Sequence, residues 1–144
     1  MNLAIRPANA CDLDALVAIE NQSFAGPNWI REDFLKHDCL VAEVDGTVAG
    51  FVVFRELFSG DADTPAEREI LNLAVAAEHR GKGVAKELMN QALNRSGDFF
   101  LEVRESNSAA RQLYRKLGFV DVARRPNYYQ FPSETAIVMK MKRC

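Results

Sequence analysis

The segment from Leu71 to Leu93 constrains the fold of this chain more than any other. A short apolar run ends in a polar turn that contains Gly81 and Gly83, and apolar residues then recur with the period of one helix face. This pattern predicts a strand, a glycine turn and an amphipathic helix. The apolar positions are Leu71, Leu73, Ala74 and Val75 before the turn and Val84, Ala85, Leu88, Met89, Ala92 and Leu93 after it.

A turn of this kind can bind an anion. The first N–H groups of a helix have no intrahelical acceptor, and the helix dipole adds partial positive charge there. Glycines at positions 81 and 83 let the backbone bend sharply and approach a bulky group. The turn is therefore a candidate pyrophosphate site, with Arg80 and Lys82 adding charge at its rim. An ordinary connection between a strand and a helix fits the pattern about as well.

The spacing within the turn excludes two common phosphate loops, GxxxxGK[ST] and GxGxxG. It reads R-x-x-G-x-A from Arg80 through Gly83 to Ala85, which resembles the acyl-CoA pyrophosphate loop of the GNAT N-acetyltransferase superfamily. The resemblance implies acetyl-CoA as the co-substrate and no metal. The residues that it implies in cofactor binding are Leu73, Ala74, Val75, Arg80, Gly81, Lys82, Gly83, Val84, Ala85 and Asn107, the first three through main-chain groups.

The composition of the chain limits its domain number, its partners and its location. The chain has 144 residues, a net charge of −2 and interspersed charges, so we expect a single domain over residues 1–144 and no direct contact with nucleic acid. Its three cysteines lack metal-ligand spacing, and their odd number argues against a disulfide framework. No run of residues approaches the length of a signal core or a membrane span. We therefore expect a cytoplasmic protein without membrane contact.

The order of predicted elements indicates an α/β fold with a mixed sheet. Strands are expected at residues 3–6, 39–44, 47–57, 68–75, 99–103, 119–123 and 136–141, and helices at about 13–22, 29–36, 84–93 and 108–117. Asp12 is expected to cap the first helix, and Arg124 to Ser133 to form a loop. The resemblance implies a GNAT-like domain with a central, mostly antiparallel sheet and about four flanking helices.

A second motif lies between Asn107 and Phe119. It reads N-x-x-A-x-x-L-Y-x-x-x-G-F without a gap, preceded by L-E-V-R and followed by R-x-N-Y-Y. Together these segments closely resemble the bacterial RimI family, whose members acetylate the N-terminal alanine of a small-subunit ribosomal protein. The resemblance implies such an N-terminal peptide as the partner. The chain departs from the family pattern at Gln130 and Thr135, with Glu134 as a candidate replacement for an acidic residue before the last strand.

The resemblance also implies the catalytic residues. Acetyl transfer to an amine requires a neutral amine, and a carboxylate can accept the proton directly or through water. The general base of the family falls on Glu102, although alternation in its strand fits a solvent-facing carboxylate as well. The family tyrosine that protonates the leaving thiolate falls on Tyr114, which could also be a core tyrosine. Trp29, Tyr128 and Tyr129 are candidates to line the peptide groove.

Other functions stay open at this point. The same fold could acetylate lysine side chains or a small amine, because a fold does not fix a function. The chain could also be a non-catalytic module that binds acyl-CoA, although such a module would not need both Glu102 and Tyr114. A covalent mechanism through Cys39 is disfavoured because no histidine lies in a recognisable partner motif.

Overall fold

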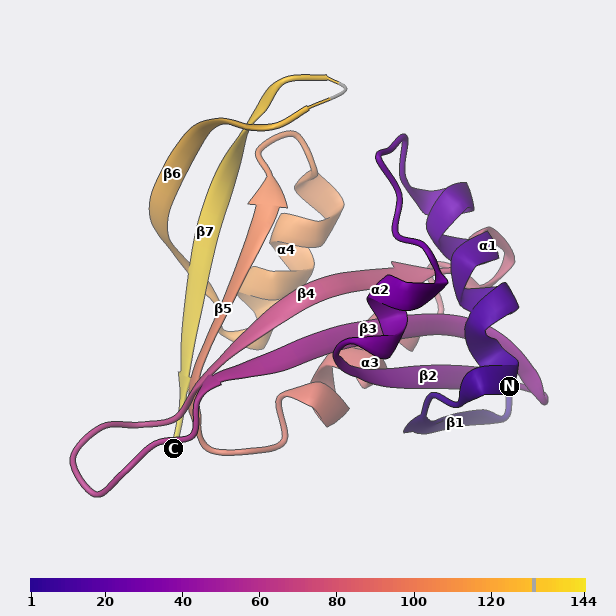
Figure 1. Ribbon diagram of the computed structural model, residues 1–144, viewed down its shortest axis with the longest axis horizontal. Coiled ribbons are helices and arrows are strands. Elements are labelled where there is room, and N and C mark those ends of the chain that lie inside the picture. The colour runs from indigo at the N-terminus through magenta and orange to yellow at the C-terminus, as the bar shows by residue number, and fades with distance from the viewer. Residues whose placement is uncertain (131) are drawn as a thin grey trace. The chain divides into compact units, whose positions relative to one another are not determined.

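A computed structural model describes residues 1–130 and 132–144 of the chain (Figure 1). The strands in these residues are β1 (Leu3–Pro7), β2 (Asp38–Val44), β3 (Thr47–Phe58), β4 (Glu67–Val75), β5 (Gly97–Arg104), β6 (Val120–Tyr129) and β7 (Glu134–Arg143). The α-helices are α1 (Leu13–Ser23), α2 (Arg31–Leu35), α3 (Val84–Ala92) and α4 (Ser108–Leu117). The strands follow the order β1-β2-β3-β4-β5-β7-β6 in a sheet. The predicted α/β fold is confirmed.

The chain divides into two compact units. The first contains Met1–Arg55 and Leu71–Asn94, and the second contains Glu56–Ile70 and Arg95–Cys144. Strands β3 and β4 each pass from one unit into the other. The single domain expected over residues 1–144 therefore stays a prediction.

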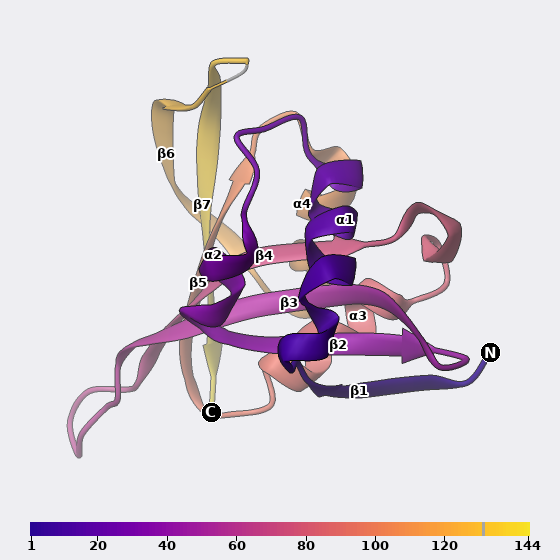
Figure 2. The ribbon, with the colours of Figure 1, turned by 45° about the vertical axis from the view of Figure 1, so that its right-hand side comes forward.

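In the first unit, helices cover both faces of the strands. Neighbouring strand residues point to opposite faces of a sheet. On β3, the Phe51 ring contacts the ring of Phe34 in α2, whereas a Cβ on Gly50 would lie 3.3 Å from Leu88 in α3. Figures 1 and 2 accordingly show α1 and α2 on one side of β2 and β3 and α3 on the other.

The face beneath α1 and α2 holds a continuous apolar core. Helix α1 supplies Leu13, Leu16 and Ile19, and α2 supplies Phe34. Its buried members are Leu13, Leu16, Ile19, Phe34, Val41, Phe51, Val53, Ala74 and Ala76. Because Ala74 belongs to this core, the end of β4 is packed into the same cluster as α1. This packing positions the segment of β4 that carries the candidate site.

In the second unit, the strands form a mixed arrangement. Strand β4 pairs with β5 in parallel over Glu67–Ile70, whereas β5 with β7 and β7 with β6 are antiparallel. Together with the antiparallel β1, β2 and β3, these pairings confirm the mixed, mostly antiparallel sheet. Helix α4 ends at Leu117, and Gly118 follows it with a φ of 110°, the left-handed conformation expected of a glycine after the last helical turn.

The loop predicted from Arg124 to Ser133 is wrong for its first half. Strand β6 continues to Tyr129, and its register against β7 shifts between Arg125 and Tyr129. Asn127 has a φ of 57° within this irregular stretch. An edge strand tolerates a proline and a bulge, and so Pro126 does not end β6. Residue 131 of the predicted loop lies outside the described residues.

Arg6, Asp12 and Glu43 form a charged cluster at the start of the first unit. Two guanidinium nitrogens of Arg6 donate to the Asp12 carboxylate at 2.8 and 2.9 Å, and its Nε donates to Glu43 at 2.7 Å. Asp12 does not cap α1 with its side chain as predicted, because the carboxylate also accepts the backbone N–H of Asn9. The Arg6 hydrogen bonds hold the pKa of the buried Asp12 below its usual value.

We predict that Asp12→Asn lowers the free energy of unfolding at neutral pH by about 1.5–3 kcal/mol, because a charged hydrogen-bond acceptor is lost. A carboxyl with a lowered folded pKa stabilises the fold above its unfolded pKa of about 4, and that contribution disappears as pH falls through the folded pKa. The difference between parent and variant should therefore shrink in acid. Urea unfolding at neutral and acidic pH measures it.

The matched control is Asp14→Asn, two residues further along the chain in α1. The Asp14 carboxylate is exposed and pairs with Arg31 at the surface. Its replacement should cost below about 1 kcal/mol. Equal losses from the two variants would contradict a special role for Asp12.

Candidate active site

The first set of candidate residues lies in the first unit, where the predicted strand, glycine turn and helix are confirmed. Strand β4 ends at Val75, a short 3-10 turn follows over Ala77–His79, and α3 begins at Val84. Gly81 and Gly83 have φ angles of 76° and 83°, and no heavy atom lies within 4 Å of the place where a Cβ would be. The backbone beside the N-terminus of α3 is therefore open to a bulky anion, as a pyrophosphate would require.

Arg80 holds this turn together. Its Nε donates to the carbonyl of Val75 at 2.9 Å, and a terminal nitrogen donates to Ser23 Oγ at 3.1 Å. The guanidinium thus joins the turn to the end of β4 and the end of α1. Lys82 is exposed, as expected for a residue at the rim of the turn.

The last turn of α1 makes further polar contacts with the same segment. The buried Glu20 carboxylate accepts the Asn72 side-chain amide at 2.7 Å and the backbone N–H of Trp29 at 3.1 Å. Gln22 accepts the backbone N–H of Ala77 at 2.9 Å. The loop that carries Trp29 is therefore tied to β4 through one carboxylate.

Sequence reasoning missed Glu20. A signal was present, because Leu13, Leu16 and Glu20 share one helical face at the spacing i, i+3 and i+7. A glutamate on an apolar face is rarely buried unless it has partners. The position itself therefore indicated a specific polar contact.

The remaining candidates of the first unit lie in or beside the core. Ala74 and Val75 are buried, and Leu73 and Trp29 are half-buried. Trp29 packs edge-on against Phe34, with ring centroids 5.3 Å apart. The side chains of Leu73, Ala74 and Val75 thus fit a packing role, which leaves their backbone groups available for the predicted main-chain contacts.

The second set lies in the second unit and centres on Glu102. Its neighbours Leu101 and Val103 are buried on the opposite face of β5, while the Glu102 side chain is 18% exposed. Glu102 Oε1 accepts Arg125 Nη1 at 2.6 Å. Its other oxygen, Oε2, is buried and has no hydrogen-bond partner among the described residues. A buried carboxylate oxygen without a partner is costly, and such atoms call for an explanation such as a substrate or an ordered water.

Tyr114 lies on α4 and is 8% exposed. Its ring packs edge-on against Phe119, with centroids 5.9 Å apart. Burial raises the pKa of Tyr114 to about 12. The phenol therefore stays protonated at neutral pH and can act as a proton donor.

Asn107 caps α4, because its Oδ1 accepts the backbone N–H of Ala110 at 3.1 Å. The adjoining loop is held by Glu134, which accepts the Ser106 N–H at 2.5 Å and a nitrogen of Arg104 at 3.2 Å. These hydrogen bonds keep the pKa of Glu134 below its usual value. Cofactor contact by Asn107 stays a prediction.

The doubled tyrosine of β6 is fixed by two arginines. The guanidinium of Arg125 lies 4.6 Å from the Tyr128 ring centroid, and that of Arg104 lies 4.5 Å from the Tyr129 centroid. Arg104 also donates to the carbonyls of Gln130 and Pro132. Burial raises the pKa of Tyr129, and burial together with the Glu102 charge raises the pKa of Tyr128. Both rings are therefore ordered, neutral surfaces, and Tyr128 is exposed.

A covalent role for Cys39 finds no support. Its thiol is half-buried, and burial raises its pKa to about 12. The reactive thiolate is therefore scarce at neutral pH. Within residues 1–130 and 132–144, no group of His, Cys, Asp and Glu side chains could hold a metal ion.

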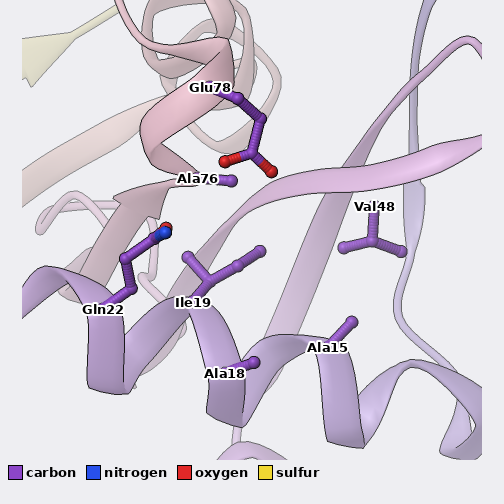
Figure 3. Close-up of a pocket in the computed structure, with 7 residues that line it drawn as sticks. All are labelled: Ala15, Ala18, Ile19, Gln22, Val48, Ala76 and Glu78. Atoms are coloured by element: carbon purple, nitrogen blue, oxygen red, sulfur yellow. The ribbon is translucent and has the colours of Figure 1, made fainter.

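A shallow hollow in the first unit lies beside α1 (Figure 3). Figure 3 shows side chains of α1 along one side of it and Val48 on another. None of the predicted site residues lines it. The lining residues are Ala15, Ala18, Ile19, Gln22, Val48, Ala76 and Glu78.

Comparison with known proteins agrees with the predicted family. The model of the acetyltransferase (GNAT) family matches residues 12–119. A protein of Haemophilus influenzae named [ribosomal protein bS18]-alanine N-acetyltransferase is 32% identical over 150 residues, covering 94% of this chain and 95% of that protein. An uncharacterized protein of Mycobacterium leprae is 31% identical over 147 residues and covers 96% of this chain, but the match spans only 40% of that longer protein.

Solved structures give the same result. The crystal structure of the ribosomal-protein-S18-alanine N-acetyltransferase from Escherichia coli has a TM-score of 0.84 and 27% sequence identity. The match covers 98% of this chain and 94% of that protein. In the described part of this chain, no helix has the length and apolar character needed to cross a membrane.

We predict that Gly83→Val weakens acetyl-CoA binding at least about 10-fold, which corresponds to about 1.4 kcal/mol. A branched side chain would fill the open space beside the N-terminus of α3. Calorimetric titration with acetyl-CoA measures the affinity, and thermal unfolding measures the stability.

Gly46→Val is a matched control. Gly46 lies in the turn between β2 and β3 and has the same φ of 83°, also with no atom within 4 Å of a Cβ position. Both variants should lose similar stability from backbone strain, but only Gly83→Val should lose affinity. Parental affinity in Gly83→Val would show that the turn does not bind the cofactor.

Proposed function

The chain belongs to the acetyltransferase (GNAT) family, and we propose that it transfers an acetyl group from acetyl-CoA to the N-terminal α-amine of a protein. The acceptor that we propose is the N-terminal alanine of a small-subunit ribosomal protein. The relative from Haemophilus influenzae carries that activity in its name and is covered almost from end to end. The observation in this chain that carries the proposal is the Glu102 carboxylate, with one oxygen fixed and the other buried without a described partner.

The glycine turn binds the pyrophosphate of acetyl-CoA in this proposal. The N–H groups at the start of α3 and the open backbone of Gly81 and Gly83 are suited to an anion. Main-chain groups of the segment from Leu73 to Val75 bind the acetyl and pantetheine portion, and one N–H polarises the thioester carbonyl. Asn107 adds a cofactor contact from the loop before α4. The chemistry requires no metal.

Glu102 and Tyr114 carry the proton transfers. An α-amine has a pKa of about 8, so most of it is protonated at neutral pH. Glu102 removes a proton from the amine, directly or through a water molecule. The amine nitrogen then forms a bond to the thioester carbon, the carbon–sulfur bond breaks, and the departing sulfur takes the phenolic proton of Tyr114. The nitrogen releases its remaining extra proton to solvent, which gives the amide, and solvent returns a proton to Tyr114. Burial suits Tyr114 for this step, because it keeps the phenol protonated.

The acceptor peptide contacts Trp29, Tyr128 and Tyr129 in this proposal. Trp29 lies on a loop held by Glu20, and the two tyrosines are held by arginine side chains. Ordered surfaces reduce the entropy lost when a flexible peptide binds. Tyr128, which is exposed, gives the peptide an accessible ring.

Mass spectrometry with different acceptors tests the substrate class. We expect acetylation of a peptide with a free alanine N-terminus. The same peptide with a blocked N-terminus and an internal lysine, and a small polyamine, should stay unmodified. Modification of the blocked peptide or the polyamine would move the function to lysine or small-amine acetylation. Cofactor binding without transfer to any acceptor would favour a non-catalytic module.

We predict that Glu102→Gln lowers kcat/KM by about 10²–10⁴-fold, because general base catalysis contributes that much. The loss should be largest below the amine pKa, where a proton must be removed, and acetyl-CoA affinity should be unchanged. A pH–rate profile with a calorimetric titration measures both quantities. If the profile of the variant matched that of the parent, Glu102 would not be the base.

A further inference from the structure

Arg104 is the last residue of β5 and follows Glu102 by two positions. Its guanidinium bonds to the end of the hairpin that β6 and β7 form: Nη2 donates to the carbonyl of Gln130 at 2.9 Å, and Nη1 donates to that of Pro132 at 3.0 Å. The same guanidinium lies 4.5 Å from the centroid of the Tyr129 ring. One side chain of β5 therefore contacts the hairpin at three points.

Glu134, the first residue of β7, is the acidic partner of Arg104. Its Oε1 accepts Arg104 Nη1 at 3.2 Å, and its Oε2 accepts the backbone N–H of Ser106 at 2.5 Å. The side chains of Arg104 and Glu134 are 28% and 17% exposed, so both are shielded from much of the solvent. A planar guanidinium that binds a carboxylate, two carbonyls and an aromatic face has little freedom to rotate.

The hairpin needs this support because its own hydrogen-bonded ladder is irregular. The register of β6 against β7 shifts between Arg125 and Tyr129, and Asn127 within this stretch has a φ of 57°. Pro126 has no N–H to donate to the ladder. Tyr129 pairs with Glu134 only beyond the shift. The position of the Tyr129 ring therefore depends on contacts outside the ladder, and the guanidinium supplies them.

The ring that Arg104 holds belongs to the surroundings of the proposed catalytic side chains. Burial raises the pKa of Tyr129, and the nearby Glu102, Tyr128 and Tyr114 raise it further. The hydroxyl of Tyr128 also hydrogen-bonds to Glu102. The hairpin thus presents its two tyrosines beside Glu102, and Arg104 fixes the second of them.

We propose that Arg104 is a positioning residue for the acceptor peptide: it holds the end of the β6–β7 hairpin, and with it the Tyr129 ring, against the end of β5 before the peptide binds. The inference rests on the proposed contact between Tyr129 and the peptide. Arg104 acts through the hairpin and transfers no proton. A hairpin that is already ordered loses less conformational entropy on binding, so the contribution of Arg104 appears in peptide affinity.

The first test does not depend on activity. The chain has three tyrosines, so labelling with fluorotyrosine gives three fluorine resonances, each assigned by its loss when that tyrosine is replaced by phenylalanine. We expect Arg104→Gln to move the Tyr129 resonance toward its position in the urea-unfolded protein, because the ring loses the guanidinium that lies over it. The Tyr114 resonance, which comes from α4, should stay in place.

Arg68→Gln is the matched control. Arg68 makes the same kinds of contact near the start of β5: its guanidinium donates to the carbonyl of Ser96 at 2.6 Å, pairs with Glu56 and lies over the ring of Phe99. Thermal unfolding should show a comparable loss of stability in Arg68→Gln and Arg104→Gln. In Arg68→Gln, however, the Tyr129 resonance and the peptide kinetics should match those of the parent.

The second test is the kinetics with the alanine peptide. Arg104→Gln should raise KM for the peptide about 10-fold and leave kcat within about 2-fold of the parent, because lost ordering weakens the binding of substrate and transition state alike. Acetyl-CoA affinity should be unchanged, since the Arg104 carbonyl that accepts the Asn107 N–H at 3.0 Å remains in the variant. Arg104→Lys should recover only part of the peptide affinity, because an ammonium lacks the fork that reaches two carbonyls.

An unmoved Tyr129 resonance in Arg104→Gln would overturn the proposal, and so would an equal change in Arg68→Gln. A fall in kcat with an unchanged KM would contradict it as well, because Arg104 would then act on the chemical step. If the parent protein acetylated none of the acceptors, the proposed function would fail, while the fluorine spectra would still decide whether Arg104 fixes the hairpin. The two failures are therefore distinguishable.

Discussion

The buried carboxylate of Glu20 is the contact on which the first unit's candidate site depends. It has no basic partner among the described hydrogen bonds and is satisfied by two neutral donors, the Asn72 amide and the Trp29 N–H. Leaving such a group unpaired costs about 1–3 kcal/mol or more, so both donors are held where the carboxylate needs them. One donor lies on β4, just before the segment predicted to bind the cofactor, and the other on the loop predicted to bind the peptide. A single side chain thus holds both of these segments within the same unit.

Gln22 and Ser23 extend this arrangement toward the glycine turn. Gln22 accepts the N–H of Ala77, and Ser23 accepts a hydrogen bond from Arg80. The turn predicted to bind an anion is open beside Gly81 and Gly83, so no side chain packs against it there. Its position is fixed instead by polar contacts at its edges. The arginine of the R-x-x-G-x-A motif therefore has a structural role in addition to its charge, since it binds the last carbonyl of β4.

The sequence allowed the fold to be predicted where periodicity and glycine positions were strong. The strand, turn and helix around Gly83 are confirmed because they depend on local backbone chemistry. The continuation of β6 through Pro126 was missed, since Pro126 and Asn127 are typical of a loop and only pairing with β7 keeps them in a strand. The Glu20 contacts and the Arg125 ion pair were missed as well. They join residues 52 and 23 positions apart, and no local pattern specifies such partners.

The two proposed catalytic side chains have opposite environments, and the difference fits their roles. Tyr114 is enclosed by apolar packing, which penalises the phenolate and keeps the proton on the oxygen. Glu102 instead has a charged neighbour, because one of its oxygens accepts a hydrogen bond from the Arg125 guanidinium. The proposed acid is therefore held by apolar packing, whereas the proposed base is held by a charged hydrogen bond.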